Sequence, residues 1–254
     1  MTHLLGILSK YLMINDHFSY QPPTCPLDIC YQDKDIVVVA KPSGLLTNPG
    51  KGAHLADCLL SRVQNIFPTA LLVHRLDLAT SGLVVFALRR KAETALKQQF
   101  AERSVKKTYL ARVWQQPQPP AATIDLPLIA DLQAPPRNKV CFEHGKAALT
   151  HYQTLSSTDK HALLALYPHT GRAHQLRVHL QSIGHPILGD GLYAHEEAKT
   201  AAPRLLLHAL ALELNQPYSG SRLRFVAPAD SEAFALSETT CVAYQQILTL
   251  PISV

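Results

Sequence analysis

Several features that define large classes of protein are missing from this 254-residue sequence. No run approaches the roughly 20 apolar residues of a membrane-spanning helix, so we expect no transmembrane segment. The apolar stretch at residues 4–8 is too short for the core of a secretory signal, and no small-residue cleavage pattern follows it. Neither a P-loop nor a Gly-x-Gly-x-x-Gly fingerprint is present, which leaves nucleotide cofactors without a recognisable site. These absences favour a cytoplasmic protein.

The cysteines and histidines do not form a metal-binding pattern. The five cysteines are odd in number and include no Cys-x-x-Cys pair, which favours reduced thiols over a disulfide framework or a structural zinc site. Among the 13 histidines, His174 and His179 are five residues apart and miss the i, i+4 spacing that would place both on one helix face. We therefore expect no metal site.

The composition that is present fits one catalytic-sized domain. With 47% hydrophobic residues the chain can bury one large core, and nothing indicates disorder or a fibre. The net charge of +5 suits an anionic partner such as nucleic acid, although ordinary soluble proteins often share it. Charge alone therefore leaves the partner open.

We divide the chain into three parts. Residues 1–28 show no lasting period, and we expect a loosely ordered leader in which Met13 is an alternative candidate for the first residue. Residues 29–235 form the predicted folded body, and residues 236–254 a weakly patterned C-terminal tail. The proline-rich stretch 115–139 is predicted to be an insertion or long connection inside the body.

Strand patterns outnumber helical ones in the body. Helices are predicted at 55–67, 91–102 and 172–184. Strands are predicted at 29–40, where an Asp-Lys-Asp turn separates two runs, and at 71–73, 83–88, 108–114, 148–155, 161–167, 205–214 and 223–226. Because helices and strands do not alternate as βαβ units would, we predict an α+β fold with a mixed, mainly antiparallel central sheet and flanking helices.

One carboxylate lies in a polar turn that runs directly into an apolar strand at residues 74–86. Asp77 in this turn has two interpretations. It caps backbone amides beside Gly82, as turn residues commonly do, or it is a functional acid held near the sheet interior, where an ionised group needs a cation. Arg172 is the candidate cation, because a guanidinium at a helix start could pair with Asp77 and keep it anionic. The alternative is that Arg172 and Arg177 are solvated helix residues.

Four segments carry a resemblance to a known family. His-Arg-Leu-Asp-Leu-Ala-Thr-Ser-Gly at 74–82 is followed by Lys-Thr-Tyr-Leu-Ala-Arg-Val at 107–113, Thr-Gly-Arg-Ala-His-Gln-Leu-Arg-Val-His at 170–179 and Leu-Leu-His-Ala at 206–209. In this order they resemble the motifs of the RluA family of pseudouridine synthases. The likeness departs at Ala173, where the family usually has Ser or Thr, and at 215–217, where Asn-Gln-Pro replaces a commoner His-Pro ending.

The resemblance implies a function and a site for the body. Residues 29–235 would be a catalytic domain that breaks the N1–C1′ bond of a uridine in RNA and joins C5 to C1′, without a cofactor or a metal. Asp77 corresponds to the catalytic aspartate, which either adds covalently or removes the C2′ proton to form a glycal. Arg172 corresponds to the arginine that pairs with it, and Leu207 to an apolar platform beneath the base. Tyr109 corresponds to the tyrosine that packs on the uracil, although its sequence context alone favours core filling over base stacking.

The RNA would also need contacts outside the base pocket. The target base must leave its stack, and Arg75, with His74 beside it, is the candidate to fill the vacated space. A structural salt bridge is the alternative for Arg75. Further contacts to the RNA, which solvated helix ends would explain nearly as well, are expected from Arg103, Lys106, Lys107 and Arg177.

The segments 41–46, 125–129 and 203–209 are most similar to family members that modify a uridine in a 23S rRNA hairpin and one in the tRNA anticodon stem-loop. We expect these RNAs as partners, a monomer, and no S4-type RNA-binding domain before the body. The alternative function is a non-catalytic RNA-binding or RNA-chaperone protein that uses the same cleft. An unrelated hydrolase is disfavoured, because Ser81 lacks the Gly-x-Ser-x-Gly nucleophile elbow.

Overall fold

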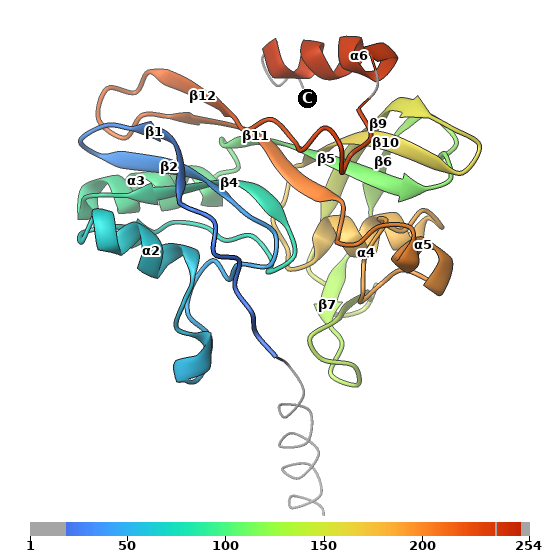
Figure 1. Ribbon diagram of the computed structural model, residues 1–254, viewed down its shortest axis with the longest axis horizontal. Coiled ribbons are helices and arrows are strands. Elements are labelled where there is room, and N and C mark those ends of the chain that lie inside the picture. Colours follow the sequence, from blue (N-terminus) through green and yellow to red (C-terminus); the bar gives the residue numbers. More distant parts are fainter. Residues whose placement is uncertain (1–18, 237, 250–254) are drawn as a thin grey trace, which may run out of the picture.

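The computed structural model describes residues 19–236 and 238–249, and one long sheet runs through it (Figure 1). The strands of this sheet are β1 (Asp28–Gln32), β2 (Ile36–Lys41), β3 (Leu71–Leu72), β4 (Ser81–Ala87), β5 (Lys106–Trp114), β6 (Ala121–Asp125), β9 (Leu149–Ser157), β10 (His161–Pro168), β11 (Leu207–Asn215) and β12 (Arg222–Val226). A second, two-stranded sheet contains β7 (Leu128–Ala130) and β8 (Asn138–Val140). The helices are the 3-10 turn η1 (Ala53–Leu55), α2 (Leu59–Ile66), α3 (Arg90–Ala101), α4 (Gln175–Ser182), α5 (Glu196–Thr200) and α6 (Glu238–Thr249).

The long sheet is mixed and mainly antiparallel. Its order is β1-β2-β4-β11-β5-β10-β9-β6, with β12 paired to β11 and β3 paired to β4. The short contact between β4 and β11 is parallel, whereas the other strand pairs are antiparallel. This arrangement confirms the predicted α+β class and its mainly antiparallel sheet with flanking helices.

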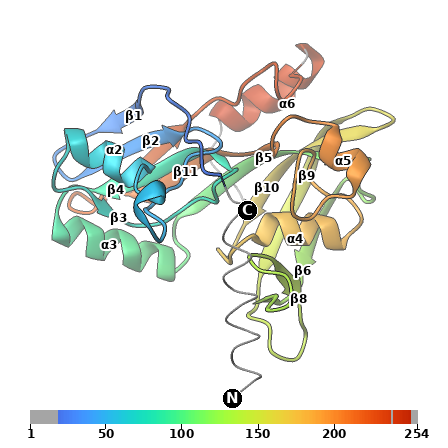
Figure 2. The same cartoon turned by 60° about the horizontal axis from the view of Figure 1, so that its bottom comes forward.

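Strand β2 is covered on both faces. Ile36 and Val38 pack in the cluster that contains α3, whereas Val37 and Val39 pack in the cluster that contains α2. All four are fully buried, because successive side chains of a strand point to opposite faces. Figure 2 shows α2 and α3 beside β1, β2 and β4, and α4 and α5 beside β9 and β10. The molecule therefore has two halves, which meet where β11 pairs with β5.

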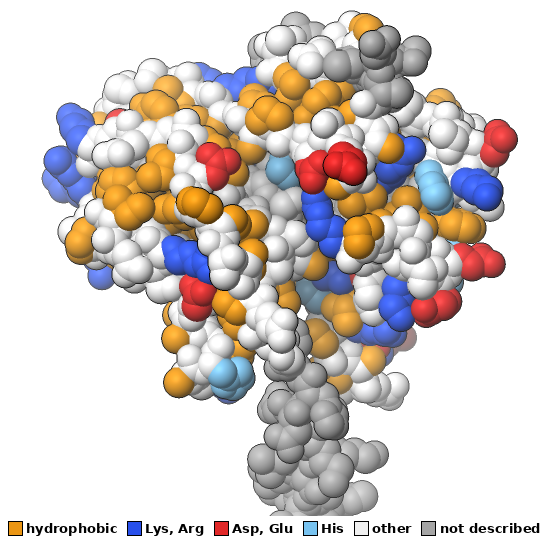
Figure 3. All heavy atoms as spheres, viewed as in Figure 1, with side chains coloured by type: hydrophobic (Ala, Val, Ile, Leu, Met, Phe, Trp, Pro, Cys, Tyr) orange, Lys and Arg blue, Asp and Glu red, His pale blue; other side chains and the backbone are white. Residues whose placement is uncertain are grey.

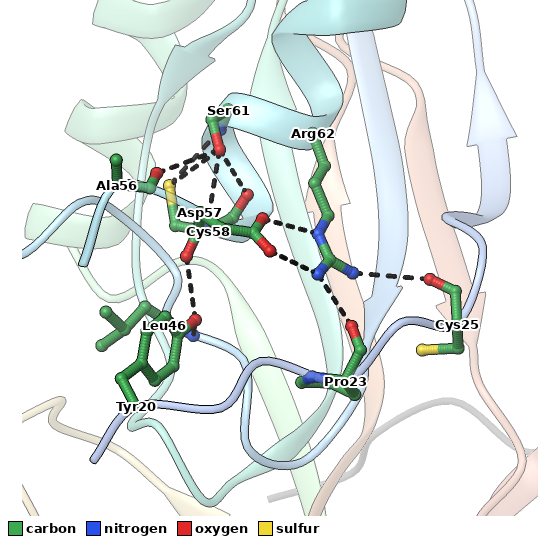
Figure 4. A network of polar contacts seen from close by, with 9 residues as sticks. All are labelled: Tyr20, Pro23, Cys25, Leu46, Ala56, Asp57, Cys58, Ser61 and Arg62. Atoms are coloured by element: carbon green, nitrogen blue, oxygen red, sulfur yellow. Dashed lines mark hydrogen bonds and ion pairs between the residues drawn. The ribbon is translucent and has the colours of Figure 1, made fainter. Parts of the chain in front are cut away.

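The end of the predicted leader is tied to the body rather than loose. The Tyr20 hydroxyl donates to the backbone carbonyl of Asp57 over 2.9 Å (Figure 4). Arg62 of α2 donates to the carbonyl of Pro23 over 2.7 Å and forms a two-pronged ion pair with the Asp57 carboxylate. The expectation of loose order is therefore wrong for this stretch. The rest of the leader, with Met13, lies outside the described residues.

The proline-rich stretch 115–139 contributes strands that were not predicted. β6 pairs with β9, and β7 pairs with β8. Pro120 directly precedes β6 and Pro127 directly precedes β7, so neither proline removes a hydrogen bond from inside a strand. The many prolines correctly indicated breaks between these strands. They also led us to predict a long connection in place of the strands.

The predicted C-terminal tail contains a docked helix. The Tyr244 hydroxyl of α6 accepts the backbone amide of Ala229 over 2.8 Å, and Arg224 of β12 donates to the carbonyls of Ile247 and Leu248. Tyr244, Ile247 and Leu248 have helical spacing and pack against the main core cluster. Packing, rather than a strong sequence pattern, therefore stabilises this helix. No helix in the described part of the chain is long and apolar enough to cross a membrane.

Gly82 allows β4 and β11 to meet. It pairs with Ala209, and its φ is +110°. A Cβ atom at this position would lie 2.3 Å from the carbonyl oxygen of Ala209 and 2.6 Å from its nitrogen, so no side chain fits. Because Asp77 precedes this contact by five residues, the close approach of the two strands also positions the turn that contains Asp77.

We expect Gly82→Ala to lower the free energy of unfolding by about 2 kcal/mol more than Gly220→Ala does. Both glycines have positive φ, but a Cβ at Gly220 would meet nothing within 4 Å. The pair therefore separates backbone strain from the steric conflict with Ala209. Urea unfolding followed by circular dichroism measures the difference, and equal losses would show that the strand contact is not required.

Candidate active site

A pocket of about 100 Å³ opens at the turn between β3 and β4. The carbonyl of Asp77 accepts the amide of Thr80 over 3.1 Å, which closes the turn. The Asp77 side chain is 23% exposed and borders the pocket. Predicted site residues from distant parts of the chain share this lining: Arg75, Asp77, Lys107, Tyr109, Arg172, Arg177 and Leu207.

Arg177 is the guanidinium that meets Asp77. Its Nη1 lies 3.6 Å from Oδ2 of Asp77. Its other nitrogens are held by Asp190, with Nε donating to Oδ2 over 2.8 Å and Nη2 donating to Oδ1 over 2.7 Å. Burial lowers the pKa of Arg177, but the hydrogen bonds and charge of Asp190 and the charge of Asp77 outweigh it and raise that pKa. Arg177 is thus a fixed positive charge at the pocket.

The predicted pairing of Arg172 with Asp77 is wrong. Helix α4 begins at Gln175, three residues later than predicted, after His174 in a left-handed conformation with φ 55°. Arg172 therefore lies in the turn before the helix, where it is exposed and its Nε donates to the carbonyl of Ala147 over 3.1 Å. It still borders the pocket. Arg177, which we assigned to RNA contacts, is only 5% exposed and is engaged within the protein instead.

The first six residues of helix α4 are all buried, although three of them are polar or charged. Gln175 donates to the carbonyl of Leu149 and to the hydroxyl of Thr150, each over 3.0 Å. The ring of His179 contacts the Thr150 hydroxyl and the carbonyl of Leu126, each at 3.0 Å. With these polar groups paired, the helix tolerates the burial of its first six residues. Its rigidity fixes the position of Arg177.

His174 lies beside Asp77, and Tyr193 lies beside Arg177. Neither residue was predicted as a site residue. His174 Nε2 lies 3.9 Å from Asp77, and its Nδ1 lies 2.7 Å from the Tyr193 hydroxyl. Burial lowers the pKa of His174, while the charge of Asp77 opposes that effect. The Tyr193 ring lies 5.0 Å from the guanidinium carbon of Arg177, within the range of a cation–π contact. The left-handed His174 backbone gives no signal in the sequence.

Tyr109 and Leu207 lie on neighbouring strands at the pocket. Tyr109 lies in β5, and Leu207 is the first residue of β11. Both border the pocket, and Leu207 is 3% exposed. Burial, with the nearby charge of Asp77, raises the pKa of the Tyr109 phenol, so it stays neutral and is not a base. The pocket therefore combines the carboxyl group of Asp77 with aromatic and apolar walls, as a nucleobase requires.

The buried amine of Lys41 donates hydrogen bonds to the turn of Asp77 and to the loop after β2. No motif in the sequence indicated a role for Lys41. Its side chain is 1% exposed, and Nζ donates to the carbonyls of Pro42, Leu45 and Leu78 over 2.9, 2.7 and 3.0 Å. Burial lowers the pKa of Lys41 to about 7, while the charge of Asp77 opposes the shift. Because Leu78 follows Asp77, this amine joins the turn of Asp77 to the loop after β2.

The remaining predicted RNA-contact residues differ in their surroundings. Arg75 is exposed at the rim of the pocket. His74 accepts the backbone amide of Val85 over 3.1 Å and stacks on Phe100, and burial lowers its pKa to about 3. The His74 ring is neutral and bonded within the protein, so it supports the turn of Asp77. These surroundings do not favour the predicted contact between His74 and RNA. Lys107 borders the pocket, and Arg103 and Lys106 border an adjoining hollow.

Within the described part of the chain, no group of three or more His, Cys, Asp or Glu residues is arranged to hold a metal ion. His174 and His179, the pair considered in the sequence, have separate partners.

Comparisons with known proteins agree with this geometry. A model of the RNA pseudouridylate synthase family matches residues 35–182. The dual-specificity RNA pseudouridine synthase RluA of Escherichia coli (strain K12) is 51% identical over 214 residues, which are 84% of this chain and 98% of that relative. RluA of Yersinia pestis is 53% identical over 203 residues, 80% of this chain and 98% of the relative. The solved structure of human RNA pseudouridylate synthase domain containing 1 has a TM-score of 0.72 and 26% identity, and it covers 92% of this chain and 100% of its own.

The matched span includes the turn of Asp77, Tyr109 and all of α4. Sheet, pocket and matches together define a protein that acts on a base in RNA. This chain belongs to the RNA pseudouridylate synthase family, and the resemblance to its RluA members is confirmed.

Replacement of the two arginines should have unequal effects on stability. We expect Arg177→Met to lower the free energy of unfolding by about 3 kcal/mol or more, because the buried Asp190 carboxylate loses its partner. Arg172→Met should cost less than about 1 kcal/mol, since its guanidinium is exposed. Adding Asp190→Leu to Arg177→Met should restore part of the loss. Similar losses in both single variants, measured by urea unfolding, would contradict the assigned pairing.

Lys41→Met should loosen the loop after β2 and the turn of Asp77 together, because three backbone carbonyls lose their donor. We expect a loss of about 2 kcal/mol in unfolding free energy and faster amide hydrogen exchange in residues 42–47 and 76–80. Lys160→Met, at an exposed turn, is the control and should change neither. Unchanged exchange in both loops would rule out this role for Lys41.

Proposed function

We propose that this protein isomerises uridine to pseudouridine in both ribosomal and transfer RNA. The observation that carries the proposal is the Asp77 carboxylate, paired with Arg177 and facing a pocket bordered by Tyr109 and Leu207. The dual-specificity relatives are matched over 98% of their own length, which supports the same two classes of substrate here. By the same likeness, we propose a 23S rRNA hairpin and the tRNA anticodon stem-loop as the target structures.

Asp77 does the central chemistry in this proposal. As a carboxylate it either attacks the ribose C1′ or the base, or removes the C2′ proton, and each path releases the uracil so that C5 can join C1′. Arg177 keeps the carboxylate oriented. Tyr109 and Leu207 confine the detached base while it turns. Arg75, exposed at the rim, enters the space that the flipped uridine leaves in the RNA.

A non-catalytic RNA-binding or RNA-chaperone protein is less well supported. A surface that only binds RNA gains nothing from a carboxylate at the centre of its cleft, because that charge repels phosphates. Here the Asp77 carboxylate is held in place by a dedicated ion-paired arginine. Such an arrangement is typical of a catalytic acid or nucleophile.

We propose in addition that the protein acts as a monomer in the cytoplasm. The catalytic residues proposed here all come from one chain and border one pocket. The described cysteines are free thiols, which suits a reducing compartment.

Replacing Asp77 by Asn separates the two functions. We expect Asp77→Asn to reduce pseudouridine formation by at least about 10³-fold while RNA affinity stays within about threefold. The assay is tritium release from RNA labelled with [5-³H]uridine, run on a 23S rRNA hairpin and on an anticodon stem-loop. Asp159→Asn, in an exposed turn, is the matched control and should keep full activity. Full activity in Asp77→Asn, or no release by the wild type from either RNA, would overturn the proposal.

A further inference from the structure

A second hollow, of about 230 Å³, lies beside the active-site pocket and is lined mainly by positive or imidazole groups. Its ionisable lining consists of Arg103, Lys106, Lys107, His151 and His169, together with the phenol of Tyr167. No Asp or Glu of the described chain belongs to this lining. On the face drawn in Figure 3, Lys and Arg side chains lie at several separate places, and Asp and Glu side chains lie beside some of them.

This hollow is connected to the active site. Lys107 and Pro168 line both the hollow and the pocket of Asp77. A third, open hollow of about 480 Å³ shares Arg103 and His169 with the basic hollow, and it shares Arg75 with the pocket. A strand of RNA whose uridine enters the pocket would therefore pass over the basic hollow as well.

The positive groups of the hollow repel one another. Burial and the charge of Arg103 lower the pKa of Lys107 to about 8. The pKa of His169 is lowered by burial and then by the charges of Arg103, Lys106, Lys107 and His151. Because Arg and Lys are the only residues of this lining that carry a full charge at neutral pH, a bound anion relieves their repulsion and is attracted to each of them.

The donors of the cluster are well placed for an oxyanion. Arg103 lies in the turn directly after α3, at φ 59°. Lys107 is anchored by donating to the carbonyl of Thr170 over 3.3 Å. His151 Nδ1 lies 2.6 Å from the hydroxyl of Thr123; when that hydroxyl donates, the proton of the neutral ring is on Nε2, which leaves a donor for a ligand. Guanidinium, ammonium and imidazole donors together match a phosphate group.

We propose that this hollow binds a backbone phosphate diester of the RNA strand next to the flipped uridine, with Arg103, Lys107, His151 and His169 as its contacts. The inference rests on the proposed function, because it takes the strand in the pocket to be RNA. It goes further in assigning one phosphate to a defined site. That phosphate helps to hold the strand while the uridine occupies the pocket.

Binding at this site takes up protons. His169 faces Arg103, Lys106 and Lys107, whose charges help to lower its pKa in the free protein, whereas a bound phosphate favours the imidazolium. A phosphate diester stays anionic across this range, so its affinity for the site rises as His169 and Lys107, whose pKa is lowered to about 8, gain protons. RNA affinity therefore increases as the pH falls from about 8 to about 6, and part of the increase depends on His169.

Charge removal at the hollow tests the site. We expect Arg103→Gln to weaken binding of an anticodon stem-loop roughly tenfold and to reduce the slope of log Kd against log salt by about 1. The replacement keeps a non-glycine residue at the same positive φ. Lys160→Gln removes one charge from the opposite end of the β9–β10 hairpin and should change affinity less than twofold. The variant His169→Gln should lose part of the gain in affinity at low pH.

A neutral linkage in the RNA identifies the phosphate. Single methylphosphonates are placed at each position around the target uridine, with the matching 2′-deoxy phosphodiester as control. One position should weaken binding to the wild type about tenfold and have little further effect on Arg103→Gln, because both changes remove the same contact. If every methylphosphonate weakens binding to the wild type and to Arg103→Gln equally, the site does not hold a phosphate and the proposal is wrong. That outcome with pseudouridine still formed would leave the proposed function intact, whereas no pseudouridine from wild type would reject the function itself.

Discussion

The ion pair between Arg177 and the buried Asp190 is the interaction on which the active site depends. Asp190 is fully buried, and besides Arg177 its Oδ1 accepts the amides of Leu192 and Tyr193 over 2.9 and 3.1 Å. A carboxylate with so many donors cannot rotate, and a two-pronged contact fixes the plane of the guanidinium as well. The remaining nitrogen of Arg177 is then directed at Asp77. The Asp77 carboxylate is thus oriented by a chain of groups that ends in the protein interior.

The sheet brings the other parts of the site to this pair. The order β4-β11-β5 makes three strands neighbours that are far apart in the chain. Asp77 lies in the turn before β4, Leu207 begins β11, and Tyr109 lies opposite Ala209 in β5. The parallel contact at Gly82 aligns the start of β4 with the start of β11. One feature of backbone packing therefore places an acid beside an apolar wall.

The sequence predicted the identity of most site residues but not their connections. The motif at residues 74–82 identified Asp77, and the later motifs identified Tyr109 and Leu207, because each lies in a long local pattern. The choice between Arg172 and Arg177 failed, since it depends on where α4 begins. His174 adopts a left-handed conformation, so the helix begins only at Gln175. No sequence pattern predicts that conformation.

Residues that act through burial were the hardest to predict. Lys41 and Asp190 have ordinary sequence neighbours, and their importance comes from contacts with distant or enclosed groups. The strands within residues 115–139 were not predicted because prolines interrupt the strand pattern. Helix α6 was not predicted because its apolar pattern is weak. Each of these depends on tertiary packing, which local propensity does not encode.

The central claim is that a guanidinium fixed from behind orients the catalytic carboxylate, and the single-turnover rate of Asp190→Asn tests it most directly. The amide keeps the volume of the side chain but removes the charge that holds Arg177. With RNA saturating, we predict a rate of pseudouridine formation about a hundredfold below that of the wild type, with RNA affinity unchanged. A wild-type rate in a folded Asp190→Asn protein would contradict the account.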